Sequence, residues 1–193
     1  MNEAEITSKL KALLKESRFN HSISVAQTAR ELALRFGACP DKAYLAGLVH
    51  DCAKCFTPEE LYKKIGFYGI DLSPDTLSAE PLLHSFVGAF EAKYVYGIDD
   101  EEILDAIYYH TIGKADMAPL TAIIYIADAI EPLRSYPGVE RIRLEAESSL
   151  EKAIYTYTCK TIDYVKRNGN FLHPNAEEVR EFYKQKIKQR RLP

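Results

Sequence analysis

The chain of 193 residues has no tryptophan, only four cysteines, and nine residues each of glycine and proline. So little glycine and proline excludes a collagen-like or linker-rich protein. No apolar run approaches the roughly 20 residues that a membrane-spanning helix needs. The first residues are acidic and polar, which does not suggest a signal peptide. We therefore expect a globular protein that has no membrane partner and is located in the cytoplasm.

Cysteine is scarce, and acidic residues slightly outnumber basic ones. Four cysteines do not make a disulfide framework, so we expect reduced thiols. The formal net charge is -3, which argues against general binding of DNA or RNA, because that requires a basic surface. We interpret the basic end of the chain as a solvated last helical turn, with an anion or nucleic-acid contact as the alternative. It comprises Lys184, Lys186, Lys188, Arg190 and Arg191.

Apolar residues recur with helical spacing along almost the whole chain, and no convincing alternating strand occurs. This pattern predicts an all-α fold with a single domain over residues 1–193. Residues 67–79 read as the longest loop, either a lid over a site or a plain connector. Helices are expected at 3–15, 22–36, 40–53, 58–66, 81–96, 99–111, 117–131, 138–167 and 175–190. The long apolar helix at 138–167 fits either a homodimer or a packed monomer.

Several histidines and one aspartate fall on or beside apolar helical stripes. A buried carboxylate is costly unless it is paired or bound to a cation. A single inward histidine is more often a hydrogen-bonded core residue than a ligand, but here separate helices each bring such a group. The economical shared partner is a metal ion, and mixed imidazole and carboxylate ligands suit Zn, Fe, Mn, Ni or Co. The residues are His21, His50 with the adjacent Asp51, His84, His110 and Asp128.

The order of these residues resembles the HD superfamily of metal-dependent phosphohydrolases, which are helical bundles. The local sequence is more similar still to one branch, the symmetrically cleaving diadenosine tetraphosphate hydrolases of the YqeK type. The motifs that carry the resemblance lie at 18–21, 50–54, 81–84, 109–111, 126–134 and 137–140. They define a motif-bearing core at about 18–140, with C-terminal helices following at about 138–190.

The resemblance implies a site for two divalent or trivalent metal ions. One ion is expected on His21, His50, Asp51 and Asp128. A second is expected on His84 and His110, with Asp51 bridging the two. The branch implies iron, with Mn, Co, Ni and Zn as alternatives. Asp51 and Lys54 are the expected catalytic residues.

The implied reaction is hydrolysis of diadenosine tetraphosphate and related dinucleoside polyphosphates to two ADP, or GDP-like products, by a metal-bound hydroxide. No nucleophile elbow or glycine-rich phosphate loop occurs, which fits metal chemistry. Some expected substrate contacts have plainer alternatives: salt bridges for the arginines, a backbone hydrogen bond for the threonine and a helix cap for the histidine. The expected contacts are Arg18, Lys54, Thr111, Arg134 and His173.

Two other functions stay open. One is an HD-type nucleotidase or nucleotide phosphodiesterase of different specificity. A cyclic di-GMP hydrolase is disfavoured, because Thr111 and Gly113 follow His110 without a Gly-Tyr-Pro signature. The other is a metal- or nucleotide-sensing module without turnover, although all six ligand positions are filled. Cys52 and Cys55 introduce sensitivity to oxidation, but their helical surroundings do not favour a thioredoxin-like motif.

Overall fold

Helices account for all the regular structure in residues 1–190, which are the residues that the computed structural model describes. Arg191 of the basic end lies outside them. No strand occurs in 1–190, so the all-α prediction is confirmed. None of the described helices is both long and apolar enough to cross a bilayer. The elements are α1 (Glu3–Leu13), α2 (Glu16–Phe36), α3 (Pro40–Val49), the 3₁₀ turn η1 (Cys52–Cys55), α4 (Pro58–Tyr68), α5 (Pro74–Ser78), α6 (Glu80–Tyr94), α7 (Glu101–Tyr109), α8 (Pro119–Ile130), α9 (Val139–Ala146), α10 (Leu150–Arg167) and α11 (Asn175–Gln189).

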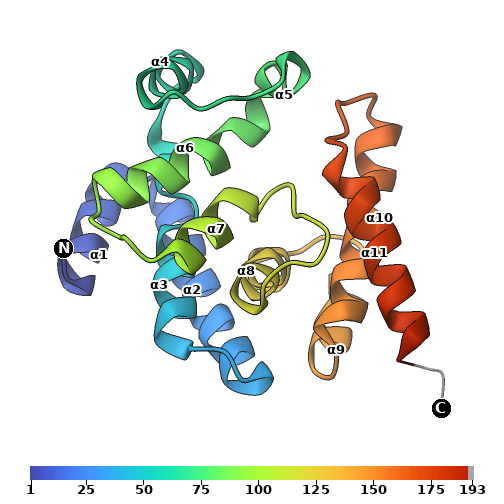
Figure 1. Cartoon of the computed structure of the whole chain (residues 1–193). Coiled ribbons are helices and arrows are strands. Elements are labelled where there is room, and N and C mark those ends of the chain that lie inside the picture. Colours follow the sequence, from blue (N-terminus) through green and yellow to red (C-terminus); the bar gives the residue numbers. More distant parts are fainter. Residues whose placement is uncertain (191–193) are drawn as a thin grey trace.

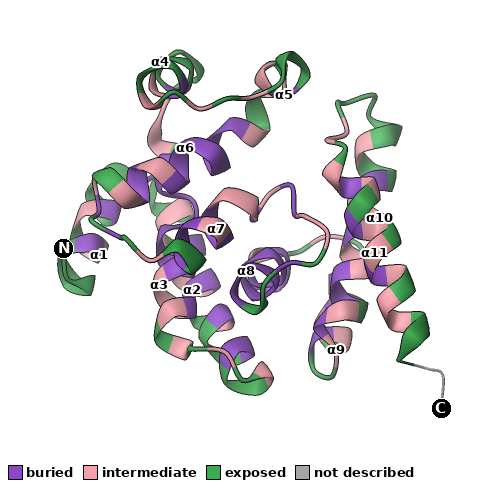
Figure 2. Cartoon of the chain, viewed as in Figure 1, coloured by how far each residue is buried: buried purple, intermediate pink, exposed green. Residues whose placement is uncertain are grey.

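Helix α8 is the centre of the bundle. It is apolar on every side, and nearly all its residues are buried (Figure 2). Such a helix is stable only when neighbours surround it. Helices α2, α3 and α7 pack on one side of α8 and α10 packs on another, with α11 lying along α10 (Figure 1). This arrangement places Asp128 of α8, which is half-buried, among the other helices that carry predicted site residues.

Helices α2 and α3 approach each other closely because α3 has a face of small residues. A Cβ atom added at Gly47 would lie 2.8 Å from the Cα atom of Ala26, so only glycine fits there. Ala43 and Ala46 are fully buried on the same helix. The close contact brings the end of α3 next to α2, and these two elements carry His50 and His21.

Helices α4 and α5 lie at one end of the molecule, against α6 (Figure 1). A buried carboxylate fastens α4: Glu91 of α6 accepts hydrogen bonds from Lys64 (2.8 Å) and Tyr68 (2.6 Å). The loop expected at 67–79 is partly wrong, because it contains α5. Ser73 caps that helix by accepting the backbone N–H of Thr76 at 3.2 Å, and Pro74 occupies its first turn.

Three other predicted helices differ from the observed ones by more than two residues. The expected helix 138–167 is two helices, because Ser149 takes an extended conformation and its side chain accepts the N–H of Lys152, which starts α10. The expected helix 40–53 ends at Val49 and continues as η1. Helix α2 begins at Glu16, well before residue 22, so His21 lies within a helix. The end of α2 at Gly37, in the left-handed conformation, is as predicted.

Candidate metal centre

The structure brings all six predicted metal-binding residues together at the middle of the bundle. They come from five helices or helix ends: α2, α6 and α8, the end of α7, and the end of α3, which carries both His50 and Asp51. All are buried except Asp128, which is half-buried. The six residues are His21, His50, Asp51, His84, His110 and Asp128.

Asp51 lies at the junction of two groups of histidines. Its Oδ2 atom is 3.4 Å from Nε2 of His50 and 3.8 Å from Nε2 of His21. Its Oδ1 atom is 3.2 Å from Nε2 of His84 and 3.6 Å from Nε2 of His110. The two oxygens of one carboxylate therefore face two different histidine pairs, which is the arrangement expected of a bridging ligand.

Asp128 completes the first group. Its Oδ1 atom lies 3.0 Å from Nε2 of His21 and 3.8 Å from Nε2 of His50. The first group thus offers two imidazoles and two carboxylates, and the second offers two imidazoles and Asp51. The family resemblance implies this division, although donor atoms of His50, His110 and Asp128 also lie within 4.8 Å of one another.

The Nδ1 atom of each of the four histidines is hydrogen-bonded, and these bonds fix the tautomers. His50, His84 and His110 donate from Nδ1 to the carbonyls of Gly47 (2.7 Å), Pro81 (2.8 Å) and Ile107 (2.6 Å). The Nδ1 atom of His21 lies 3.0 Å from Oε1 of Glu131 and donates to that carboxylate. Each neutral ring therefore presents the lone pair of Nε2 to the centre, as a metal ligand must.

These donors fit a divalent metal. The buried Nε2 atoms of His21 and His50 have no hydrogen-bond partner among residues 1–190, although both point at carboxylates. A nitrogen lone pair facing a carboxylate is repulsive unless a cation lies between them. Asp51 is ionised: burial raises its pKa, but positive charge at His50 and hydrogen bonds from protonated histidines, whose place a metal ion would take, hold the pKa well below its ordinary value. A mixed imidazole and carboxylate set is typical of Zn, Fe, Mn, Co or Ni.

Three cations lie around the carboxylates. The guanidinium of Arg18 donates to Oδ2 of Asp51 at 2.7 Å. Arg134 donates from Nε to the carbonyl of Asp128 at 2.8 Å and also bonds its side chain. Lys54 is exposed, but partial desolvation beside the centre lowers its pKa, while the charges of Asp51 and Asp128 act to raise it. Beside them is a cavity of about 430 Å³, lined by Ser17, Arg18, Asn20, His21, Glu131, Leu133 and Arg134.

Thr111 lies beside one of the six residues, whereas His173 lies outside their cluster. The hydroxyl of Thr111 is 3.4 Å from Nε2 of His84. Nδ1 of His173 accepts the backbone N–H of Asn175 at 3.2 Å, at the start of α11, outside the cluster of six. The Asn175 side chain in turn donates to the carbonyl of Gly113 at 2.7 Å, which fastens this segment to the loop that follows His110.

Cys52 and Cys55 lie beside the centre as free thiols. The thiol of Cys52 donates to the carbonyl of Gly88 at 3.5 Å, and that of Cys55 to the carbonyl of Cys52 at 3.4 Å. Burial raises the pKa of both thiols, so both are protonated at neutral pH. A protonated thiol is a poor nucleophile, which leaves the histidines and carboxylates as the reactive groups.

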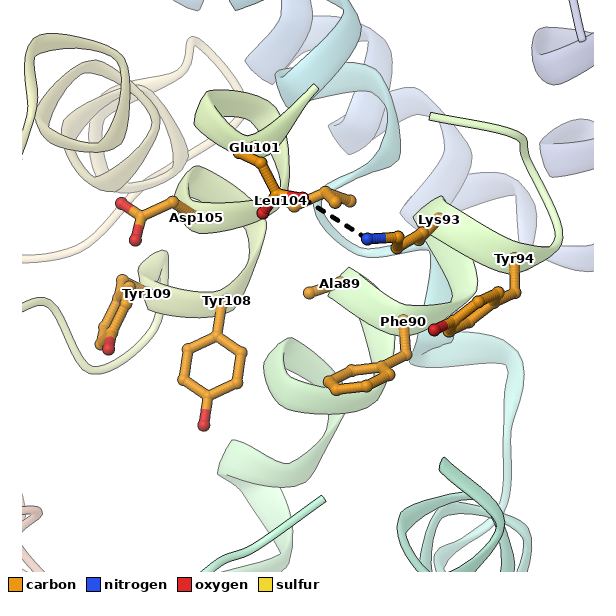
Figure 3. A pocket seen from close by; sticks show the side chains of 9 residues that line it. All are labelled: Ala89, Phe90, Lys93, Tyr94, Glu101, Leu104, Asp105, Tyr108 and Tyr109. Carbon is orange, nitrogen blue, oxygen red and sulfur yellow. Dashed lines mark hydrogen bonds and ion pairs between the residues drawn. The ribbon is translucent and has the colours of Figure 1, made fainter. Parts of the chain in front are cut away.

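A second cavity, of about 480 Å³, contains none of the predicted site residues (Figure 3). It lies between α6 and α7 and has aromatic walls, formed by Phe90 and Tyr94 on one side and Tyr108 and Tyr109 on the other (Figure 3). The Lys93 ammonium is 3.4 Å from the Glu101 carboxylate at its edge, so these charges are already paired.

Comparison with known proteins identifies the family of the chain. The family model described as HD domain matches residues 18–133. The chain is 38% identical to the symmetrical bis(5'-nucleosyl)-tetraphosphatase of Bacillus subtilis (91% of this chain, 94% of that protein). It is 40% identical to the one from Staphylococcus aureus, with 84% of each chain covered. A crystal structure from Clostridium acetobutylicum, described as a predicted HD superfamily hydrolase involved in NAD metabolism, superposes with a TM-score of 0.93 at 40% identity, covering 96% of this chain and 98% of that one.

Proposed function

This chain belongs to the HD domain family, and on that premise we propose that it hydrolyses diadenosine tetraphosphate and related dinucleoside polyphosphates symmetrically to two ADP. The observation that carries the proposal is the Asp51 carboxylate, whose two oxygens face two separate pairs of histidines. Relatives that carry the name of this activity share 35% identity or more with nearly the whole chain. Both the donor set and the sequence therefore point to one chemistry.

The proposal assigns the metal ligands by group. One ion is held by His21, His50, Asp51 and Asp128, and the other by Asp51, His84 and His110. When bound, such a pair polarises phosphate oxygens and lowers the pKa of a water molecule into the neutral range. We propose iron as the metal, from the family resemblance. The same donors also accept Mn, Co, Ni or Zn.

Positively charged side chains near the cavity neutralise the negative charge of the substrate. Water adds to one phosphorus of the central P–O–P link, the bond from that phosphorus to the bridging oxygen breaks, and the second ADP leaves. Arg18 and Arg134 neutralise the polyphosphate, because guanidinium groups bind phosphate through two parallel hydrogen bonds, and the ammonium of Lys54, outside the cavity lining, adds a third positive charge. Arg18 and Arg134 already donate to Asp51 and Asp128, so phosphate bound there lies directly beside the two donor groups.

Thr111 and His173 are proposed as further substrate contacts. The hydroxyl of Thr111 lies beside His84, within reach of a phosphate oxygen that approaches the second group. His173 belongs to the segment that Asn175 fastens to Gly113, next to the same loop. We assign His173 to the nucleoside side of the substrate. We propose that the reaction takes place in the cytoplasm, that the substrate is a small anion, and that the protein does not bind nucleic acid.

Product analysis with metal quantification on the same sample tests the proposal. The purified protein is incubated with diadenosine tetraphosphate, and the nucleotides are separated by anion-exchange chromatography. We expect ADP as the sole product and about two metal ions per chain. ATP with AMP, or inorganic phosphate, would show a different bond to be cleaved. Two bound metals without turnover would point to another nucleotide or to a sensing role. Light scattering on the same sample tests for a homodimer.

A further inference from the structure

The histidines of the centre differ in one respect. Three of them donate from Nδ1 to a backbone carbonyl, whereas His21 donates to the carboxylate of Glu131. Glu131 is only 1% exposed, although it directly follows the last residue of α8. A buried carboxylate needs partners, and this one uses both of its oxygens.

The second oxygen of Glu131 organises the wall of the substrate cavity. Oε2 accepts the backbone N–H of Leu133 at 2.7 Å, which shapes the turn that leads to Arg134. Arg143 of α9 fastens the same turn, since its guanidinium donates to the carbonyls of Glu131 and Arg134, both at 2.9 Å. Leu133 and Arg134 line the 430 Å³ cavity. One side chain therefore touches both a proposed metal ligand and the turn that carries a proposed phosphate-binding arginine.

We propose that Glu131 is a positioning residue that acts in two directions: it strengthens His21 as a ligand of one metal ion only, and it orders the turn at Leu133–Arg134 for substrate. A carboxylate that accepts from the far nitrogen of a ligating histidine fixes the ring and raises its basicity. Because His84 and His110 have backbone partners of their own, the second metal does not depend on Glu131. The part of the inference that concerns substrate rests on the proposed function. The part that concerns metal binding by His21 does not depend on it.

Glu131→Gln is the informative variant. The amide oxygen still accepts from His21, but the negative charge is gone, and the amide NH₂ then faces the N–H of Leu133, which is also a donor. Glu91→Gln is the matched control, because Glu91 is also buried (4% exposed) and paired, yet contacts none of the six residues. Both variants are checked by circular dichroism and thermal unfolding before use.

Calorimetric titration of the metal-free protein with Mn²⁺ gives a readout that does not depend on turnover. We expect two binding steps in the wild type and in Glu91→Gln. In Glu131→Gln one step weakens by about 10–100-fold while the other is unchanged. In the double variant that carries both Glu131→Gln and His84→Asn, both Mn²⁺ binding steps weaken, because His84→Asn removes a ligand of the other metal. At saturating Mn²⁺ the KM of Glu131→Gln for diadenosine tetraphosphate stays raised, because the turn is still disordered.

Two results would overturn the inference. One is an Mn²⁺ isotherm of Glu131→Gln that matches wild type, with unchanged KM. The other is equal weakening of both steps together with lowered thermal stability, which marks a merely structural role. If the Gln variant does not fold, Glu131→Asp is titrated instead: it keeps the charge but is too short to reach both partners, so the same asymmetric loss is expected. A wild type that binds two Mn²⁺ but leaves diadenosine tetraphosphate intact would refute the proposed function, while the titration would still decide the role of Glu131.

Discussion

The Nε2 atoms of His84 and His110 lie 3.1 Å apart, and each ring donates from Nδ1 to a carbonyl of its own helix. In neutral rings with these tautomers, two lone pairs point at each other beside Oδ1 of Asp51. A metal ion between the two nitrogens removes this repulsion. Without metal, protonation of one ring would also remove the repulsion. Burial opposes this protonation and lowers the pKa of His84 to about 4.

Metal-free protein is therefore expected to lose stability in weak acid because of His84. In the unfolded chain a histidine titrates near pH 6.5, so between that pH and about 4 the unfolded chain binds more protons than the folded one. Stability contributed by neutral His84 is present above this window and is lost as the pH falls through it, by about 1–2 kcal/mol between pH 7 and 5. Urea unfolding of wild type and His84→Asn, stripped of metal, measures the difference.

The comparison isolates His84. Attraction by Asp51 and Asp128 outweighs burial and raises the pKa of His50, so its contribution has the opposite sign and is lost as the pH rises. That contribution is present in both proteins and cancels in the difference. The depressed pKa of Asp51 acts only at lower pH. Identical pH profiles for wild type and His84→Asn would refute the assignment.

Asp51→Ala is expected to lose both metal ions and most activity, because this carboxylate faces both histidine pairs. Mutation of a residue that only hydrogen-bonds to a metal ligand already lowers metal affinity or activity by about 10–100-fold. Removal of a ligand shared by both metals should therefore lower activity by at least about 100-fold. Metal analysis by mass spectrometry and the rate of ADP release measure the two effects. Asp41→Ala is the control, since Asp41 is exposed and, within residues 1–190, pairs only with Arg30. Full metal content in Asp51→Ala would show that the site is assigned wrongly.

Lys54→Ala is expected to separate substrate binding from metal binding. Hydrogen bonds to charged groups contribute about 1.5–3 kcal/mol, so kcat/KM should fall by about 10–100-fold. Metal content should stay at the wild-type level, because the ammonium of Lys54 is not a metal donor. Lys63→Ala serves as the control, because Lys63 is exposed on the outside of α4. Loss of metal in Lys54→Ala would contradict its assignment to substrate.

The inward histidines could be recognised in the sequence because a polar residue on an apolar stripe is a local signal. Long-range partners give no such signal: Glu131 is 110 residues from His21, and the bonds of Glu91 to Lys64 and Tyr68 join different helices. Helix ends lie between these cases. Ser73 and Ser149 are capping residues that the sequence contains, yet the apolar period around Ser149 continues in phase, so periodicity alone merged α9 with α10.

The close approach of α2 and α3 gives a last prediction about stability. An alanine Cβ at Gly47 would lie 2.8 Å from Cα of Ala26 and 3.1 Å from the carbonyl carbon of Val25, so the helices must separate. Overpacking of this kind costs about 1–3 kcal/mol, and for a chain of this length each kcal/mol lowers Tm by about 2–4 °C.

Gly66→Ala is the matched control, because nothing lies within 4 Å of an added Cβ there. Gly66 lies in the last turn of α4, where alanine should gain up to about 0.5–1 kcal/mol. Since Gly47 accepts the Nδ1 hydrogen bond of His50, Gly47→Ala should also weaken Mn²⁺ binding, which Gly66→Ala should not. Equal Tm values for the two variants would mean that α2 and α3 tolerate a side chain at Gly47, and unchanged Mn²⁺ binding in Gly47→Ala would mean that this contact does not set the position of His50.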